Sequence, residues 1–362
     1  MIEVAGAGMA GLVVAARLRE LGVDAAVREK GTRVGGSMLL SSCVLWRHAD
    51  WDTFRAECPD GDERLQRLVW ERLDDGLAWL RSLGAEPVWD ETGNPCTTGQ
   101  RFDPRSLTTM LAERAGEIEL HSGVLDDAPT ILCTGGFAAS SELVTRFVAP
   151  AGSLRLRANP WSTGDGLNHA LARGAALTGG MAEFYGRNMP DADWDETQLV
   201  SLSQLYGRFA RCFDEDGVEF FRAEDVSWSE SNIVQATARR PGAKAFYILD
   251  AAALEQWVRE QTVAEIVAAA PAEARVSLTD LPFDPPEGAL AAVRVIASIT
   301  HTVGGLRIDD RARVLDAGGT PLEALWAAGV DAGGVATGGY ASGLAQALVL
   351  GLVAAEDAAA AI

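Results

Sequence analysis

The first thirty residues constrain the fold more than any other part of the chain. From Ile2 to Lys30 they read IEVAGAGMAGLVVAARLRELGVDAAVREK. The hydrophobic pattern predicts a short buried strand, a helix that ends near Leu21, and a second strand that ends at Glu29. A glycine-rich turn separates the first strand from the helix. This order predicts a βαβ unit at the start of an α/β domain.

The spacing of the glycines in that turn predicts a dinucleotide-binding site. Gly6 permits the tight turn, Gly8 lets a pyrophosphate approach the backbone, and Gly11 lets the helix pack closely on the sheet. The N-terminus of the helix supplies free N–H donors and a partial positive charge for phosphates. Glu29 stands where an acidic side chain accepts the ribose hydroxyls. The alternative is an ordinary βαβ unit whose turn happens to contain glycines.

The next segment bears on which dinucleotide is bound. Glu29 disfavours NADP, but it does not distinguish NAD from FAD. After Lys30 the chain reads GTRVGGSMLLSS, with a second glycine pair, Gly35-Gly36, and hydroxyl groups at Ser37, Ser41 and Ser42. A nicotinamide enzyme ordinarily continues directly into its next βαβ unit. The second glycine loop therefore favours a longer cofactor, and a flexible surface loop is the alternative.

Composition excludes several classes of partner. At 362 residues the chain is long enough for about two domains. A net charge of −20 argues against nucleic acid or an anionic membrane surface as a partner. Five scattered cysteines without CxxC spacing indicate reduced thiols in a cytoplasmic protein and no metal site. No signal peptide is recognised, and the apolar segment 344–355 is interpreted as a buried helix.

Several later segments complete a pattern with the opening one. They are TILCTGG (130–136), NPWSTGDG (159–166), HTVGGLRID (301–309), AAGVDAGG (327–334) and GGYASGLAQALVLG (338–351). Together they resemble the fumarate reductase/succinate dehydrogenase flavoprotein family, which includes tricarballylate dehydrogenase and the 3-ketosteroid Δ1-dehydrogenases. The resemblance implies an α/β fold: a Rossmann-like FAD-binding domain of the GR2 type with a smaller α+β capping domain inserted.

The resemblance also implies domain boundaries. The FAD-binding domain is expected to be discontinuous, with residues 1–178 and 291–362, and to carry a helical insert at about 45–115. Residues 179–290 are expected to form the substrate capping domain, which is shorter here than in the family. Within the insert, residues 65–85 have apolar residues at helical spacing, which we interpret as core packing.

Carried over residue by residue, the resemblance implies a set of FAD contacts. The ADP half is assigned to the first βαβ unit, the pyrophosphate and flavin to the second glycine loop, and the ribitol chain to Asp331. The expected cofactor-binding residues are Gly6, Gly8, Gly11, Glu29, Lys30, Gly35, Gly36, Ser37, Ser42, Thr134, Gly135, Asp165, Gly305, Asp331, Ser342, Gly343 and Leu344. Asp165 is expected near the flavin. Met38 replaces the histidine that succinate dehydrogenases attach to FAD, so we expect FAD to be bound non-covalently.

The chemistry implied is hydride transfer between flavin N5 and a carbon next to a carbonyl or carboxyl group. The arginine that donates the proton in fumarate reductases is replaced by Trp228. A second arginine, which clamps a substrate carboxylate, is absent near Gly338. Since dicarboxylates need such clamps, fumarate itself is disfavoured.

The remaining candidates for substrate contact or catalysis are His301, Thr302, Tyr340, Trp228 and Arg294. His301 is predicted to contact substrate, with a polar residue at a strand end as the alternative. A tyrosinate at Tyr340 could act as a base towards a carbon next to a ketone. The alternative is a buried tyrosine that donates one hydrogen bond. Of the other histidines, only His48, which follows Trp46-Arg47, is singled out.

Two competing interpretations stay open at this stage. One is an NAD-dependent dehydrogenase, which would leave the loops at Gly35-Gly36 and Asp331 without a purpose. The other is a flavin-binding protein without this chemistry, acting as a sensor or an electron carrier. The expected partners are a small-molecule substrate and an electron donor or acceptor that the sequence does not identify. No motif for an iron–sulfur cluster is recognised.

Overall fold

A computed structural model describes residues 1–123, 125, 129–148 and 153–361. The chain divides into two compact units. The first contains Met1–Leu143, Ala158–Glu183 and His301–Ile362, and the second contains Val144–Arg157 and Phe184–Thr300. The predicted capping domain, residues 179–290, falls almost wholly within the second unit.

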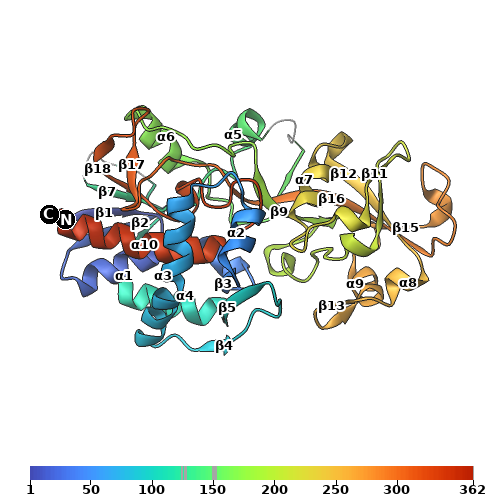
Figure 1. Ribbon diagram of the computed structural model, residues 1–362, viewed down its shortest axis with the longest axis horizontal. Helices are drawn as coiled ribbons and strands as arrows, with labels where there is room; N and C mark the ends of the chain where they lie inside the picture. The colour runs from blue at the N-terminus through green and yellow to red at the C-terminus, as the bar shows by residue number, and fades with distance from the viewer. Residues whose placement is uncertain (124, 126–128, 149–152, 362) are drawn as a thin grey trace. The chain divides into compact units, whose positions relative to one another are not determined.

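A mostly parallel six-stranded sheet organises the first unit (Figure 1). Its strand order is β17 (Arg313–Leu315), β18 (Pro321–Ala327), β7 (Thr130–Leu132), β1 (Ile2–Ala5), β2 (Ala25–Glu29) and β6 (Ile118–Leu120). Only β17 runs antiparallel to its neighbour. All four residues of β1 are buried, because β1 lies inside the sheet and helices cover it. The predicted α/β fold with a Rossmann-like βαβ start is confirmed.

Helices from both ends of the chain pack together in this unit. α1 (Met9–Glu20) contacts α10 (Gly343–Ala360) and α4 (Pro104–Ala115), and α10 also contacts α3 (Glu63–Ser82). Figure 1 shows α10 between α1 and α3. Among the described residues, α10 is the one helix long and apolar enough to cross a membrane. Within the protein, 61% of it is buried.

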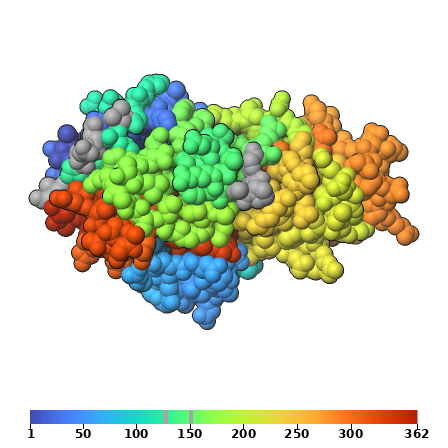
Figure 2. All heavy atoms as spheres, turned by 90° about the horizontal axis from the view of Figure 1, so that it is seen from above, coloured from blue at the N-terminus to red at the C-terminus, as the bar shows by residue number. Residues whose placement is uncertain are grey.

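The insert after the second glycine loop is a small antiparallel sheet with helices. The strand order is β3 (Val44–His48), β5 (Thr97–Phe102) and β4 (Pro87–Trp89), and α2 (Trp51–Glu57) precedes α3. The predicted helix in 65–85 is confirmed as α3. The Asp62 side chain caps its N-terminus, and the helix packs on α10. Figure 2 shows this blue segment at the surface beside red C-terminal residues.

The second unit is built on a seven-stranded sheet. Its path is β11 (Glu219–Phe221), β10 (Arg211–Phe213), β12 (Lys244–Leu249), β16 (Ala291–Thr302) and β15 (Arg275–Val276), and β8 (Arg155–Leu156) and β9 (Phe184–Pro190) also pair with β16. β10 and β11 pair antiparallel and form a β-hairpin. Strand β16 is long enough that its last two residues, His301 and Thr302, belong to the first unit.

The remaining elements are short. In the first unit lie α6 (Asp165–Ala172) and two 3₁₀ helices, η1 (Gly36–Leu40) and η7 (Gly329–Asp331). The helix α5 (Ser141–Phe147) crosses the division between the units. The second unit also contains α7 (Ser231–Ala238), α8 (Ala251–Leu254), α9 (Val263–Ala269) and a two-stranded sheet of β13 (Trp257–Val258) and β14 (Gln261–Thr262).

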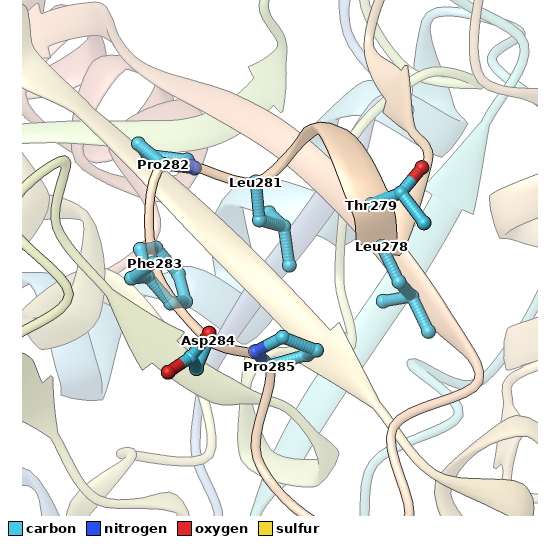
Figure 3. Close-up of a pocket in the computed structure, with 7 residues that line it drawn as sticks. All are labelled: Leu278, Thr279, Leu281, Pro282, Phe283, Asp284 and Pro285. Carbon is cyan, nitrogen blue, oxygen red and sulfur yellow. The ribbon is translucent and has the colours of Figure 1, made fainter.

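A hollow of about 540 Å³ lies in the second unit, along the loop that follows β15 (Figure 3). Its lining residues are Leu278, Thr279, Leu281, Pro282, Phe283, Asp284 and Pro285. None of the predicted site residues is among them.

Candidate functional site

The two glycine loops meet at the N-terminus of α1. Gly8 is the N-cap residue of α1, and in the described part of the chain no side chain caps this end of the helix. Gly8 forms a bridge with Gly35, and the Gly35 N–H donates to the Ala7 carbonyl at 2.8 Å. A Cβ on Gly36 would lie 3.2 Å from the Gly8 Cα. The loops therefore form a cradle without side chains beside free helix N–H donors, which suits a phosphate group.

Glu29 lies at the carboxyl end of β2, beside this cradle. One carboxylate oxygen accepts the Ala7 N–H at 2.8 Å, and the other accepts the Gly31 N–H at 2.6 Å. The residue is buried. These bonds fix the carboxylate next to the turn, where it can accept further hydrogen bonds from ribose hydroxyls, because each oxygen has two lone pairs.

Ser37 in the second glycine loop is held by a residue that the sequence did not single out. The Asn159 side-chain amide donates to Ser37 Oγ at 2.9 Å and to Ser162 Oγ at 3.2 Å. A Cβ on Gly135 would lie 2.7 Å from the same Ser162 oxygen. The predicted residues Ser37 and Gly135 therefore both lie against the NPWSTGDG segment. Ser42 is half-buried between η1 and β3.

Asp331 is buried and bonded to the loop that follows β7. Its carboxylate accepts hydrogen bonds from the Thr134 N–H, from Thr134 Oγ1 at 2.9 Å and from the Gly136 N–H at 3.0 Å. Burial raises the pKa of Asp331, and these donors partly oppose the rise. Asp331 thus ties η7 to the β7 loop, and Gly305 packs against its backbone, since a Cβ there would lie 2.7 Å from the Asp331 carbonyl oxygen.

Lys30 and Asp165 form an ion pair at the end of β2. Lys30 Nζ lies 2.8 Å from Asp165 Oδ2 and 2.5 Å from Thr163 Oγ1. Both side chains are about one-third exposed. The structure therefore places Asp165 beside Lys30, next to the acidic residue of β2.

His301 lies against the first turn of α10. A Cβ on Gly343 would lie 3.2 Å from His301 Cε1, so the glycine lets the ring approach the helix backbone. The helix is capped by Ser342, which accepts the Ala345 N–H at 3.2 Å, and Leu344 is half-buried in the same turn. Burial lowers the pKa of His301 to about 4, so its imidazole is neutral at neutral pH.

Thr302 follows His301 and faces the β7 loop. Its side chain is buried, and a Cβ on Gly136 would lie 2.9 Å from Thr302 Oγ1. Across the described ranges, no hydrogen-bond partner is found for this oxygen. A buried hydroxyl with unused bonding capacity, next to Gly135 and Thr134, suits a polar ligand at that loop.

Tyr340 lies in the loop that leads to α10, between Gly339 and the capped helix. Its ring is 5.2 Å from that of Trp46, and the residue is half-buried. Two residues earlier, the Gly338 N–H donates to Glu183 Oε2 at 2.7 Å. The sequence did not single out Glu183, and no motif in the chain signals it. A carboxylate of the protein itself therefore lies beside the position at which a clamping arginine was expected.

The two candidates in the second unit have different surroundings. Trp228 is half-buried in the segment before α7. Arg294 lies on β16, and its Nε is 2.7 Å from Asp191 Oδ2, an oxygen that Lys244 Nζ also contacts at 2.8 Å. A substrate anion at Arg294 would have to compete with Asp191.

Close to Trp228, Glu230 carries a buried carboxylate. It is 3% exposed and has a backbone φ of +56°, a conformation that costs free energy in a residue with a side chain. Arg208 Nε lies 3.8 Å from Glu230 Oε1, and Arg187 donates to the Ser229 carbonyl next to it. Burial raises the pKa of Glu230, and the charges of Arg187 and Arg208 oppose the rise.

The structure thus brings all the predicted cofactor residues into the first unit, together with His301, Thr302 and Tyr340. Within the described ranges, no group of three or more His, Cys, Asp or Glu side chains could hold a metal ion. Sequence reasoning missed Asn159 and Glu183. Asn159 opens the NPWSTGDG segment, so its place in that motif was the available signal.

Comparison with known proteins agrees with this geometry. A family described as FAD binding domain matches residues 121–344, more than half of the chain. A second family, described as NAD(P)-binding Rossmann-like domain, matches residues 4–42, which contain both glycine loops.

Individual relatives are distant in sequence. A probable fumarate reductase, Ifc3, of Shewanella frigidimarina is 23% identical over 455 aligned residues, which take in 99% of this chain and 74% of the relative. Two solved structures cover nearly the whole of both chains. The 3-ketosteroid-Δ4-(5α)-dehydrogenase of Rhodococcus jostii matches 99% of this chain and 96% of its own, with a TM-score of 0.72 and 20% identity. The 3-ketosteroid Δ1-dehydrogenase of Sterolibacterium denitrificans matches 100% and 99%, with a TM-score of 0.75 and 14% identity.

Proposed function

Because the chain belongs to the FAD-binding family of the fumarate reductase/succinate dehydrogenase flavoproteins, we propose that it oxidises or reduces a C–C bond next to a carbonyl group. FAD, when bound, supplies the hydride acceptor or donor for this chemistry. Met38 is buried directly after Ser37, and its thioether offers no site for attachment. This supports non-covalent binding of FAD.

The residues of the first unit fit FAD. The cradle of Gly8, Gly35 and Gly36 would hold the pyrophosphate, and Glu29 would accept the adenosine ribose hydroxyls. Ser37, held by Asn159, and the free hydroxyl of Thr302 would bind further polar groups of the cofactor. Asp331 would act on FAD chiefly by fixing the Thr134–Gly136 loop, since that loop already uses its carboxylate.

The observation that carries the proposed reaction is the position of a neutral histidine at the start of α10. His301 can donate a hydrogen bond to a substrate carbonyl oxygen without carrying a charge itself. The partial positive charge of the adjacent helix N-terminus stabilises negative charge that develops on that oxygen. Tyr340, three residues before Gly343, would take the proton from the neighbouring carbon or return it, through its phenolic oxygen.

The negative charge of Glu183 in the first unit supports a substrate that is not a dicarboxylate. The Gly338 N–H is already bonded to Glu183, whose negative charge would repel a substrate carboxylate there. Trp228, in the second unit, stands where the resemblance places a proton-donating arginine. We therefore propose an uncharged or singly charged carbonyl compound as the substrate, and not fumarate. The second unit is proposed as the capping domain, with Trp228 and Arg294 as its candidate substrate contacts.

The purified protein tests this proposal in two steps. A yellow protein that releases FAD on denaturation is expected, and a colourless protein that cannot be reconstituted with FAD would refute the proposal. Under anaerobic conditions, one class among ketosteroids, carboxylates and acyl thioesters should then either bleach the oxidised flavin or restore the colour of the reduced flavin. If no compound reduces the oxidised flavin or reoxidises the reduced flavin, the protein is better described as a flavin sensor or electron carrier.

A further inference from the structure

The loop that leads into α10, residues 333–342, is held by the insert that follows the second glycine loop. The Asp62 N–H donates to the Gly334 carbonyl at 2.7 Å. The Gln66 side-chain amide donates to the Val335 carbonyl at 2.9 Å, and Gln66 is fully buried. Both Asp62 and Gln66 belong to the start of α3. The sequence indicated only core packing for this helix.

The insert also contacts this loop further along, at Gly339 and Tyr340. A Cβ on Gly339 would lie 1.8 Å from the Glu57 carbonyl oxygen, so the loop backbone packs directly on the end of α2. His48 Nε2 lies 3.1 Å from the Tyr340 carbonyl oxygen. Since a carbonyl oxygen only accepts hydrogen bonds, Nε2 must carry the proton. The insert therefore contacts the backbone on both sides of the Tyr340 side chain.

His48 is itself firmly placed. It is 1% exposed, its ring stacks on Phe54 at 5.0 Å, and it meets the edge of Trp46 at 5.3 Å. The Trp70 indole N–H donates to the His48 carbonyl at 3.0 Å. Trp46 in turn packs on the Tyr340 ring. Burial of a polar side chain among aromatic rings costs free energy unless a hydrogen bond compensates for it. The contact between His48 Nε2 and the Tyr340 carbonyl oxygen is such a bond.

We propose that His48 is a positioning residue for Tyr340: its Nε2–H donates to the Tyr340 carbonyl, and with Trp46 it sets the direction of the phenol. The insert at 44–70 is then part of the machinery that supports the reactive site. This inference rests on the proposed function for the role of Tyr340 in turnover, but the position of Tyr340 can be measured without any substrate.

The four tyrosines of the chain make this test selective. Tyr340 is the one tyrosine of the first unit, because Tyr185, Tyr206 and Tyr247 belong to the second. The full chain, loaded with FAD and labelled with 3-fluorotyrosine, should give four ¹⁹F signals, of which Tyr340→Phe removes and so assigns one. His48→Phe keeps an aromatic ring and loses the donor, whereas His48→Gln keeps an N–H donor.

We expect His48→Phe to shift or broaden the Tyr340 signal while the other three signals stay in place. His48→Gln should return the signal towards the wild-type position. An unchanged Tyr340 signal in a folded His48→Phe protein would overturn the proposal. If His48→Phe does not fold, ¹⁵N spectra of the wild-type imidazole decide, since an Nδ1–H tautomer at His48 would equally overturn it.

Turnover separates this inference from the proposed function. With a substrate in hand, His48→Phe should lower kcat roughly tenfold to a hundredfold with little change in KM, because the reacting group is misplaced. If the ¹⁹F signal moves but Tyr340→Phe turns over like the wild type, the positioning contact stands and the role of Tyr340 in the proposed function fails. A loss of kcat in His48→Phe without movement of the signal would refute the positioning contact alone.

Discussion

The Glu29 carboxylate accepts the Ala7 N–H at 2.8 Å, so the end of β2 is bonded to the turn after β1. The same carboxylate accepts the Gly31 N–H with its second oxygen. One acidic side chain therefore joins the first glycine loop to the start of the second. Glu29, which is expected to bind the ribose hydroxyls, thus also fixes the two glycine loops relative to each other.

Replacing Glu29 by Gln should weaken FAD binding. The glutamine side chain has one acceptor oxygen and one donor NH₂ group, whereas both carboxylate oxygens of Glu29 accept a backbone N–H. The variant therefore loses at least one hydrogen bond to a charged acceptor. The amide also offers one charged acceptor oxygen fewer to the ribose hydroxyls, and a hydrogen bond to a charged acceptor contributes about 1.5–3 kcal/mol, which corresponds to a roughly tenfold to hundredfold higher Kd for FAD. Fluorescence titration of the apoprotein with FAD measures it. Glu119→Gln, an exposed residue on neighbouring β6, is the control and should bind FAD like the wild type.

His301→Ala should leave FAD bound and impair turnover. Loss of a hydrogen-bond donor to the substrate oxygen lowers kcat by roughly a hundredfold in comparable sites. The flavin absorption spectrum checks occupancy, and stopped-flow bleaching by the substrate checks the rate. His169→Ala on α6 serves as the control. Release of FAD from His301→Ala would show that the residue is structural.

The pH dependence of stability should report the environment of His301. Its folded pKa, about 4, lies below the unfolded value of 6.5, so the folded protein resists protonation more than the unfolded chain. This contribution to the free energy of unfolding is complete above pH 6.5 and is lost as the pH falls towards 4. Urea unfolding across that window should show a shallower decline in His301→Ala than in the wild type. Equal slopes would contradict a lowered pKa of the His301 ring.

Gly11→Ala should destabilise the first unit. A Cβ there would lie 1.8 Å from the Gly6 carbonyl oxygen, and neither backbone segment can move without opening the turn. We expect a loss of about 3 kcal/mol in the free energy of unfolding, with loss of FAD. The matched variant is Gly179→Ala, an exposed position with no atom within 4 Å of the added Cβ, which should change stability by less than about 0.5 kcal/mol.

Glu230 should make the protein less stable as the pH rises. Its folded pKa is raised by burial above the usual 4.5, so the folded state binds the proton more tightly than the unfolded chain. The resulting stabilisation is complete below pH 4.5 and is lost as the pH rises through the folded pKa. Glu230→Gln should remove this component from the pH profile of unfolding, whereas Glu224→Gln, exposed in the same segment, should not.

Much of the first unit could be predicted from local signals. The strand–glycine–helix–strand order at residues 2–29 depends on hydrophobic period and on backbone freedom at glycines, which are local properties. The same holds for α3, where apolar residues recur every three or four positions and Asp62 caps the start. The glycine loops at 6–11 and 35–36 meet in space as their separate roles required.

What the sequence did not reveal depends on tertiary contacts. Glu183 reaches Gly338 across 155 residues, and His48 reaches Tyr340 across 292. No spacing rule links such positions, because segments far apart in the sequence meet only through tertiary packing: the segment that ends at Glu183 in the first pair, and the insert in the second, approach the loop before α10. The pairing of Arg294 with Asp191 was hidden for the same reason. Backbone turns could therefore be predicted from the sequence, whereas these side-chain pairs could not.

The order of strands in the first sheet has a consequence for synthesis on the ribosome. β7 is paired on one side with β1 and on the other with β18, and α1 packs on α10. The N-terminal half of this unit thus emerges about two hundred residues before β18 and α10, which complete it. By the time β18 is synthesised, the whole of the second unit, which ends at Thr300, has already been made. Since domains tend to fold as units during synthesis, the inserted unit can mature first. The nucleotide fold would close only when the last segment leaves the ribosome, so apoprotein chains halted before β18 should be targets for chaperones and proteases.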